Sequence, residues 1–584
     1  MKIPLALSVS ERLAKCPSWF HAVVLFALVF LAFAPSLTFD FINYDDPYYI
    51  IDNPNVNTGL SLANLRWAFG TPGEVNLWNP LTTLSHQLVV SLFGLNPAWH
   101  HAVNGLCHAL AASLLFLLAV KLTKSLPWSY FIALLWAIHP QKIQSVAWIT
   151  ERKDVLSGAL FFASILCFAE WHSRTKKRPA LYVASLLLFI AAAMAKPSVL
   201  PLPLVLLVLF ALKPGQIISS ALSSLRQLGP FFAAAVALAA IVVFFQSHGT
   251  LSDVGGDDSL FERLRQMIFG YVFYLLRFAF PIPSQFFFTP PLSHLPLVLA
   301  IVGLGLFLIA VIWLGRREKL IPVGALIYTL LWLPISGIIP ISHYFAADRY
   351  SYLPQIGIII IVIGLARRLS SLSSKSLLLP IALGSLVAGY LVLLQQQLPI
   401  WKNSETLFAH EMRVNPREAL ADIHYGEAFW NNDPAKALVH FELAHQKAPH
   451  EGLPLSKMGV TQLRLNQPEQ ALESFQAATR AANPVVETWT QLLLLQVDLK
   501  RYSEAEATVN DGLQRFPNQW PMLMNAGNFH LLVKKDPHQA LPLFLKAHEI
   551  SPSNADSIRA CARCYLILGD QPSAARFERL LQLR

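Results

Sequence analysis

The sequence predicts an all-α protein in two parts, a polytopic membrane helix bundle followed by a soluble α-solenoid. Two observations carry this prediction. Over roughly the first 400 residues, apolar runs of about 20 residues recur, and runs of this length can cross the hydrocarbon core of a bilayer. From Trp401 onward polar residues return, and small residues recur at a period of about 34. We therefore expect a membrane domain at 1–400 and a soluble domain at 401–584.

The composition supports the membrane assignment of the first part. Of the 584 residues, 54% are hydrophobic and 14% are charged, whereas about a quarter are charged in a typical soluble protein. The net charge of +10 does not indicate a nucleic-acid partner, because most Lys and Arg residues of the first part lie in loops between apolar runs. In a membrane protein, that placement reports the orientation of the helices.

About eleven apolar segments are candidate membrane crossings. They fall near 19–37, 101–121, 126–139, 155–171, 179–195, 198–213, 229–246, 295–314, 321–340, 352–366 and 377–397. The basic clusters between them fall on one side if the N-terminus is cytoplasmic, as the positive-inside rule requires. A crossing by the apolar segment Leu264–Pro283 would break this pattern, so we expect it to be re-entrant or interfacial. The soluble tail then lies on the outer side.

Polar groups gather in the segments that this topology places outside. The first outer loop, about 38–100, carries Asp45 and Asp46 beside Tyr44. The other outer candidates are His139, Glu151, Arg152, Lys153, Asp154, Lys196, His343, Asp348, Arg349 and Tyr352. Basic residues on the outer side are exceptions to the positive-inside rule, and charged groups at membrane depth need a partner. We expect these side chains to converge on one cavity.

Several of these candidates also have a purely structural interpretation. Asp45-Asp46-Pro47 is an ordinary turn signal. Residues 151–154 could form a self-satisfied charge cluster that caps a span. Lys196, which precedes a proline, could extend its ammonium group to the membrane interface. His139, also followed by a proline, fits a helix end as well as a cavity group.

The tail carries an internal repeat. Ala437, Ala471, Ala505, Ala540 and Ala574 are spaced by 34, 34, 35 and 34 residues. Phe441, Phe475 and Phe544 each follow one of these alanines by four positions, and Val509 occupies the matching slot. Pro449, Pro484, Pro517 and Pro552 end the second helix of each unit. This is the tetratricopeptide-repeat (TPR) pattern of paired helices, and we expect about four or five units, starting with a partial one at 401–416. Such arrays bind extended peptides or partner helices.

Three motifs in combination suggest a family. They are Phe41–Tyr49, the stretch from His139-Pro140 through Ser145–Ile149 to Glu151–Ser157, and Asp348–Pro354. The chain, tail included, resembles the transmembrane and tetratricopeptide-repeat O-mannosyltransferase family and its bacterial relatives. The resemblance implies a GT-C fold, a polyprenyl-phosphate-linked sugar donor, inversion at the anomeric carbon and a catalytic pair at Asp45 and Asp46. Short loops favour a bacterial inner-membrane relative with a periplasmic tail.

With such a donor, the leaving group is a phosphate ester that needs cations, not a general acid. Arg152, Lys153, Lys196 and Arg349 are the expected phosphate ligands. One carboxylate suffices as the base for an acceptor hydroxyl. Neighbouring side chains of an extended chain point to opposite faces, so we expect Asp45 to be the base and Asp46 to orient the acceptor or the loop. No cofactor is firmly implied, and a divalent metal is compatible with these residues but not expected.

We therefore expect an inverting glycosyltransferase that moves a sugar, with mannose as one candidate, to an acceptor hydroxyl. The acceptor could be Ser or Thr of an exported protein. The TPR groove could bind this acceptor or a partner protein. The alternative is a non-enzymatic, membrane-anchored TPR scaffold.

Overall fold

The computed structural model describes residues 16–70, 78–211, 217–247, 259–281, 285–288, 294–338, 346–372, 378–552 and 554–582. Within these ranges every element is a helix and the only β-pairing consists of isolated bridges, which confirms the all-α class. The chain divides into two compact units, Met1–Val414 and Asn415–Arg584.

This division lies after the expected boundary at residue 400. The reason is α18 (Ser404–Val414), which packs on the first unit. Its Glu411 carboxylate accepts the backbone N–H groups of Phe286 at 2.7 Å and Phe287 at 3.3 Å, and Phe408 lies against both rings. The expected partial repeat at 401–416 therefore belongs largely to the membrane unit.

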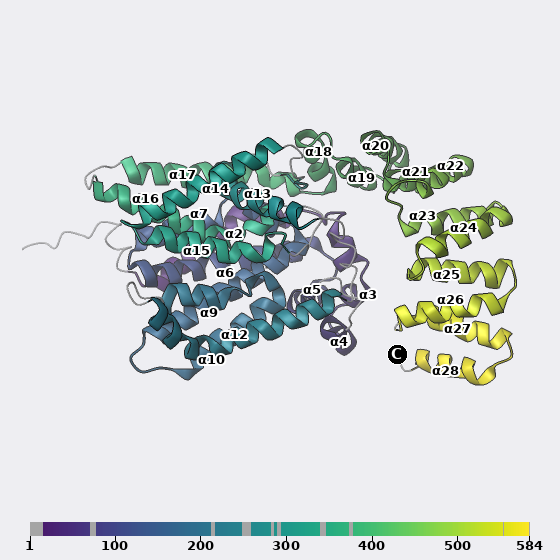
Figure 1. Cartoon of the computed structure of the whole chain (residues 1–584), viewed down its shortest axis with the longest axis horizontal. Helices are drawn as coiled ribbons and strands as arrows, with labels where there is room; N and C mark the ends of the chain where they lie inside the picture. The colour runs from purple at the N-terminus through teal and green to yellow at the C-terminus, as the bar shows by residue number, and fades with distance from the viewer. Residues whose placement is uncertain are drawn as a thin grey trace, which may run out of the picture. The chain divides into compact units, whose positions relative to one another are not determined.

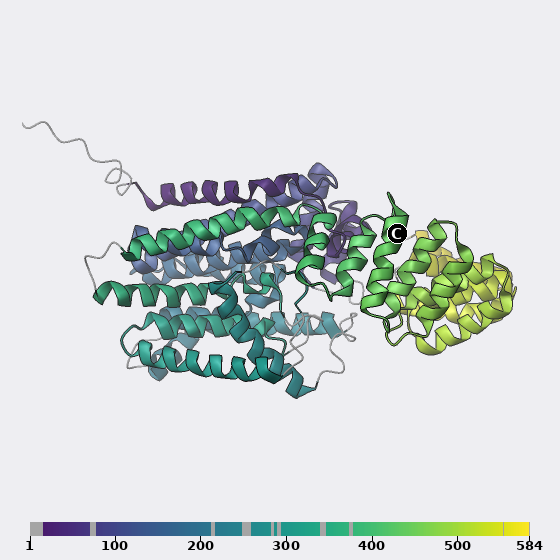
Figure 2. The same cartoon turned by 90° about the horizontal axis from the view of Figure 1, so that it is seen from above.

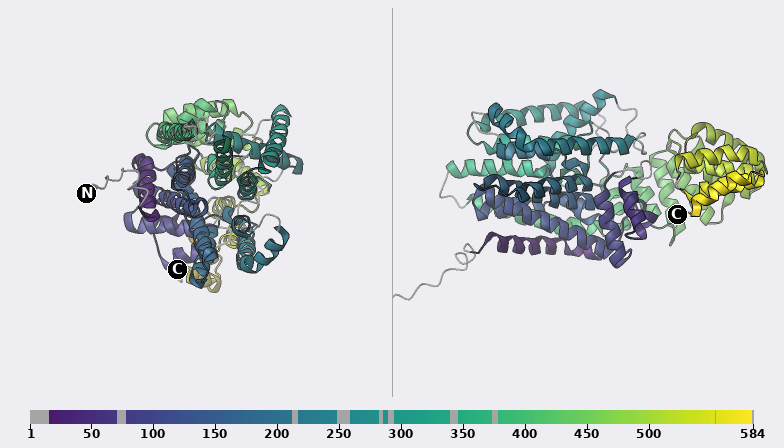
Figure 3. Two further views of the ribbon diagram at one scale, coloured as in Figure 1. Left: turned by 90° about the vertical axis from the view of Figure 1, so that its left-hand side faces the viewer. Right: turned by 90° about the horizontal axis from the view of Figure 1, so that it is seen from below.

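Helices occupy the described part of every predicted span (Figure 1). They are α2 (Ser18–Phe33), α6 (Pro97–Thr123), α7 (Leu126–Ala137), α9 (Arg152–Ser173), α10 (Pro179–Ala195), α11 (Leu202–Leu206) with η5 (Leu207–Ala211), α12 (Ile217–Ser247), α14 (His294–Gly315), α15 (Leu320–Trp332), α16 (Gln355–Leu372) and α17 (Leu378–Gln397). Six described helices are long and apolar enough to cross a membrane. The long helices of this unit run alongside one another (Figures 2 and 3). The first unit is therefore a membrane helix bundle.

The segment predicted to be re-entrant or interfacial forms α13 (Leu260–Ala279). Ser259 caps it by accepting the Glu262 N–H, and Arg277 lies in its last turn. This helix is not among the six, and its position relative to a bilayer stays a prediction.

The loop that the predicted topology places outside, here still called the first outer loop, is held against the bundle by short helices. It contains η1 (Ala34–Thr38), η2 (Pro47–Ile51), α3 (Pro54–Asn57), α4 (Leu62–Gly70) and α5 (Pro80–Phe93). Thr82 of α5 donates a hydrogen bond to the carbonyl that ends α10, at 3.0 Å. Gln87 donates to the carbonyls of Asn55 and Asn64, so the loop is also tied to itself. Asp46 accepts hydrogen bonds from Thr150, two residues before α9 begins, so Asp45 and Asp46 lie near the start of α9 (Arg152–Ser173).

The described part of the second unit is a series of helix pairs. The pairs are α19 (Ala419–Glu427) with α20 (Pro434–Lys447), α21 (Gly452–Arg464) with α22 (Pro468–Thr479), α23 (Val486–Asp498) with α24 (Tyr502–Arg515), α25 (Trp520–Asn528) and η10 (Phe529–Val533) with α26 (Pro537–Ile550), and α27 (Ala555–Ile567) with α28 (Gln571–Gln582). Each repeated alanine lies on the second helix of its pair and is buried. The TPR prediction is confirmed.

In three of the helix pairs, the repeated phenylalanine of the second helix packs against a glycine of the first helix. A Cβ atom on Gly459 would lie 2.7 Å from the ring of Phe475, and glycines occupy the matching positions of two other pairs. In the one pair with Val509 instead of Phe, the facing residue is Leu493, and both are buried in one apolar cluster. The volumes at the two positions therefore compensate, as close packing requires.

Candidate functional site

A buried carboxylate surrounded by cations lies at the start of α9. The side chain of Glu151 is 1% exposed. Its oxygens lie 2.9 Å from Lys153 Nζ, 3.2 Å from Arg349 Nε and 3.9 Å from Lys196 Nζ. The cations come from α9, from the residue after α10 and from η8 (Asp348–Ser351). Their side chains are 13–14% exposed, so they are more accessible than the carboxylate they surround.

Asp154 completes what we call the cation cluster: Glu151, Lys153, Asp154, Lys196 and Arg349. The Asp154 carboxylate pairs with Lys196 and accepts the Ser145 hydroxyl at 3.0 Å. Three cations thus face two carboxylates. Because Lys196 and Arg349 come from outside residues 151–154, this segment is not a helix cap that satisfies its own charges.

Asp45 supplies the next negative charge. Its side chain is half-buried and interacts electrostatically with Lys153. Burial alone would lower the pKa of Arg349, but the neighbouring Tyr350, Glu151 and Asp45 raise it above its ordinary value. The guanidinium therefore stays charged beside Asp45.

Asp46 faces the protein interior. One carboxylate oxygen accepts the Ile42 N–H at 2.8 Å, and the other accepts both the backbone N–H and the hydroxyl group of Thr150. Burial raises the pKa of Asp46 to about 7, although these hydrogen bonds oppose the rise. Asp46 thus anchors the loop to the residue that precedes Glu151.

An aromatic wall adjoins the cation cluster. The Arg349 guanidinium lies 5.2 Å from the centre of a Trp148 ring. The Tyr44 ring lies 5.9 Å from Trp148 and 4.9 Å from Phe286. The structure therefore brings Tyr44 to the same region as Arg349.

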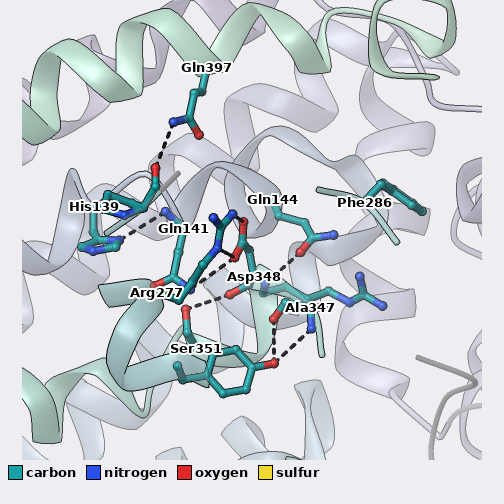
Figure 4. Close-up of polar contacts among 12 residues, drawn as sticks. His139, Gln141, Gln144, Arg277, Phe286, Ala347, Asp348, Ser351 and Gln397 are labelled. Carbon is teal, nitrogen blue, oxygen red and sulfur yellow. Dashed lines mark hydrogen bonds and ion pairs between the residues drawn. The ribbon is translucent and has the colours of Figure 1, made fainter. Parts of the chain in front are cut away.

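The turn that carries Arg349 is clamped by hydrogen bonds from two sides (Figure 4). From α13, Arg277 makes two hydrogen bonds to the Asp348 carboxylate, at 3.2 and 3.1 Å. The Tyr274 hydroxyl donates to the Ala347 carbonyl and accepts the Ala347 N–H, both at 3.0 Å. Asp348 therefore holds the turn in place and does not line the cluster.

The other side of the clamp comes from the segment around α8 (Lys142–Ala147). Gln144 accepts the Arg349 N–H at 2.9 Å, and Gln141 donates to the Asp348 carboxylate at 3.2 Å. The fully buried Lys142 donates to the Tyr352 carbonyl at 2.9 Å. The sequence did not point to this clamp, and the available signal was Arg277, one of two arginines in the apolar segment 264–283.

Arg152 is a correction to the expected set of phosphate ligands. Its side chain is fully buried and points away from the cation cluster. It donates to the Asn104 side chain at 2.9 Å, to the Ser85 carbonyl at 3.1 Å and to the His100 carbonyl at 2.9 Å. Arg152 and Lys153 are successive helical residues, so they point in different directions, and Arg152 ties α5, α6 and α9 together.

Two more expected cavity residues have packing roles instead. The His139 ring stacks on Phe278 with centres 5.0 Å apart, and its Nε2 lies 3.1 Å from the Phe278 carbonyl oxygen. The Tyr352 hydroxyl lies 2.8 Å from His108 Nδ1, within the helix bundle. His343 lies outside the described residues. In the part of the chain that the structure describes, no group of three or more His, Cys, Asp or Glu side chains could hold a metal ion.

Fold and site together define a class: a polytopic membrane protein with a TPR unit and a cluster of cations and carboxylates where the first outer loop meets the helix bundle. No family model matches the chain. It is 23% identical to Protein O-mannosyl-transferase TMTC3 of Homo sapiens over 92% of this chain and 65% of that protein. It is 34% identical to Protein O-mannosyl-transferase TMTC1 of Mus musculus over 24% of this chain and 15% of that protein. The chain is thus similar to these TMTC proteins and spans less than two thirds of their length.

Solved TPR structures also match. One is YrrB, described as a TPR protein with an unusual peptide-binding site, at 17% identity over 30% of this chain and 92% of that chain, with a TM-score of 0.25. Another is pilF of Pseudomonas aeruginosa, at 17% identity over 35% and 89%, with a TM-score of 0.27. At these TM-scores the likeness carries no argument, and the TPR assignment rests on the helix pairs and their spacing.

Proposed function

We propose that the chain is an inverting, GT-C-type glycosyltransferase that moves a sugar from a polyprenyl phosphate to a hydroxyl of a protein. Mannose as the sugar and a protein as the acceptor are suggested by the names of the relatives. The observation that carries the proposal is the cation cluster, in which three partly accessible cations from separate elements surround a buried carboxylate close to Asp45.

The cluster suits a phosphate leaving group. Lys153, Lys196 and Arg349 are partly accessible cations, and Glu151, Asp154 and Asp45 balance their charges. A sugar phosphodiester could therefore bind against cations that the protein already holds in place. When the bond between the anomeric carbon and the phosphate oxygen breaks, the electron pair leaves with the phosphate and its charge grows. Fixed cations stabilise that growing charge, so no general acid is needed.

Asp45 is the proposed base. The acceptor oxygen forms a bond to the anomeric carbon on the face opposite the departing phosphate, which inverts that carbon, and the hydroxyl proton passes to Asp45. The negative charge lost at Asp45 equals the charge gained on the phosphate, so the net charge of the site does not change. Asp46 orients the loop through Thr150, and Tyr44 borders the acceptor side.

The remaining parts follow from the expected topology. We propose a bacterial inner-membrane protein with a cytoplasmic N-terminus and a periplasmic TPR unit that holds the acceptor or a partner protein. No cofactor is part of this proposal.

The test is transfer in lipid nanodiscs from a synthetic polyprenyl-phosphate mannose to a peptide containing Ser and Thr. Asp45→Asn removes the base and is expected to abolish measurable transfer. Asp52→Asn is the matched control, because Asp52 is exposed in the same loop, and it is expected to retain the wild-type rate.

Full transfer by Asp45→Asn would show that the base is assigned wrongly. No transfer by the wild type with a panel of polyprenyl-phosphate sugars, combined with retained binding of peptides to the TPR unit, would favour the scaffold alternative.

A further inference from the structure

A cavity of about 580 Å³ lies between α2, α6, α7 and α9, away from the cation cluster. Its apolar lining comes from Leu117, Val120, Leu126 and Leu166. Its polar lining comes from Cys16, Ser18, Lys121, Lys124 and Glu170. The cavity therefore offers an aliphatic wall next to charged groups, as an amphiphile requires.

The cavity and the cation cluster lie at opposite ends of the same helices. On α6, Asn104 contacts Arg152 near one end, and Lys121 contacts Glu170 near the other. Seventeen helical residues separate Asn104 from Lys121, a rise of about 25 Å. That is close to the thickness of a bilayer core, about 30 Å, so the two polar layers fit the two membrane–water interfaces.

Aromatic residues mark the interface at the cavity end. Trp19 adjoins Ser18, Trp128 lies two residues after Leu126, and Trp171 adjoins Glu170. Trp19 is 64% exposed. Tryptophan is enriched where a membrane protein meets the lipid headgroups, so the mouth of the cavity lies at headgroup depth.

The charges at the cavity favour an anion. Glu170 pairs with Lys121 at 2.9 Å and with Arg174 at 3.6 Å. Lys124, at the end of α6, is exposed and lines the same cavity. Three cations thus accompany one carboxylate. Basic pockets between membrane helices bind the headgroups of anionic lipids.

We propose that this cavity binds the phosphate headgroup of an anionic membrane phospholipid. Lys121 and Lys124 contact the phosphate, and the hydroxyl of Ser18 is available to the glycerol backbone. The first part of an acyl chain lies against Leu117 and Leu166. The site is independent of the proposed transfer reaction, because its lining residues lie at the other end of the bundle.

Native mass spectrometry and thermal unfolding of the full chain test the site. The probes are nanodiscs of phosphatidylcholine alone, the same nanodiscs with added phosphatidylglycerol, and inorganic phosphate. Phosphatidylglycerol is expected to bind the wild type and raise its Tm. The double variant Lys121→Gln/Lys124→Gln is expected to bind it roughly 30-fold more weakly, because each of the two lysines near a lipid surface contributes on the order of 1 kcal/mol.

Two further variants separate the cavity from surface charge. Leu166→Phe narrows the cavity where the acyl chain is proposed to lie, without changing any charge, and it is expected to weaken phosphatidylglycerol binding as well. Lys176→Gln/Arg178→Gln removes two exposed charges near the same end of the bundle but outside the cavity, and it is expected to bind like the wild type.

Equal losses in both double variants would overturn the proposal in favour of general surface attraction. Unchanged binding in Leu166→Phe would also overturn it, because the lipid would then lie outside the cavity. The same rise in Tm with inorganic phosphate would assign the cavity to a free anion instead of a lipid.

Discussion

Buried polar side chains occur in both units, but they are arranged differently. In the TPR unit the Ser474 hydroxyl donates to Gln462 at 2.7 Å, and one period later Thr508 donates to Gln496 at the same distance. In the membrane unit the group around Glu151 occurs once and is assembled from α9, the end of α10 and η8. Polar contacts that repeat with the fold and satisfy themselves are part of the architecture. The single cluster draws its charges from separate elements and is not repeated by the architecture, so it is where we propose that the donor phosphate binds.

The largest expected effect tests the single cluster. Arg349→Gln removes one cation, while Gln144 still accepts the backbone N–H of residue 349. The transfer rate is expected to fall about 10²- to 10³-fold, as for other losses of a group that stabilises developing charge. Transfer assays in nanodiscs measure it, with Arg66→Gln in the first outer loop as an exposed control. A loss of less than a few-fold would remove Arg349 from the site.

The second prediction tests the repeating architecture. Val509→Phe restores the common residue of the repeat but leaves Leu493 opposite it, so the pair is overpacked. Overpacking is expected to cost about 1–3 kcal/mol of local stability. Hydrogen–deuterium exchange of α23 and α24 in the full chain measures this cost. The double variant Val509→Phe/Leu493→Gly is expected to recover part of the lost stability. If α23 and α24 exchange as fast in this double variant as in Val509→Phe alone, the volumes at positions 493 and 509 do not compensate.

The third prediction concerns the link between α13 and the cluster. Arg277→Gln removes the ion pair that holds Asp348 and thereby loosens the turn of Arg349. A loss of about tenfold in transfer is expected, smaller than for Arg349→Gln because the cation itself remains. The double variant Arg277→Gln/Arg349→Gln should transfer no more slowly than Arg349→Gln alone. Additive losses would show that Arg277 acts by another route.

The fourth prediction is a pH dependence of stability from Asp46. The pKa of the Asp46 carboxyl group is about 7 in the folded protein, against an ordinary value of 3.8. As the pH rises, the unfolded chain therefore loses this proton at a lower pH than the folded protein does. The folded state therefore becomes less stable, through this group, as the pH rises from about 4 to about 7. Thermal unfolding between pH 5 and 8 is expected to show a shallower slope for Asp46→Asn than for the wild type. Identical slopes for Asp46→Asn and the wild type would show that another group titrates in this range. Asp52→Asn serves as the control and is expected to behave like the wild type.

The sequence predicted local features well. The apolar runs located the described helices of the membrane unit, and the alanine spacing located the second helix of each TPR pair. It also singled out Glu151, Lys153, Lys196 and Arg349, because charges near apolar spans are rare and need partners. It could not separate Arg152 from Lys153, since that requires knowing which face of α9 meets α5 and α6.

The sequence by itself thus determined the helices and their repeat, because both depend on spacing along the chain: about 20 apolar residues for a span and about 34 residues for a helix pair. Only the tertiary structure decided which charges meet. Asp45 and Asp46 are neighbours in sequence, yet one lies within electrostatic reach of Arg349 and the other bonds to Thr150. The clamp of Arg277 on Asp348 joins residues far apart in the chain, and no local pattern encodes such a distance.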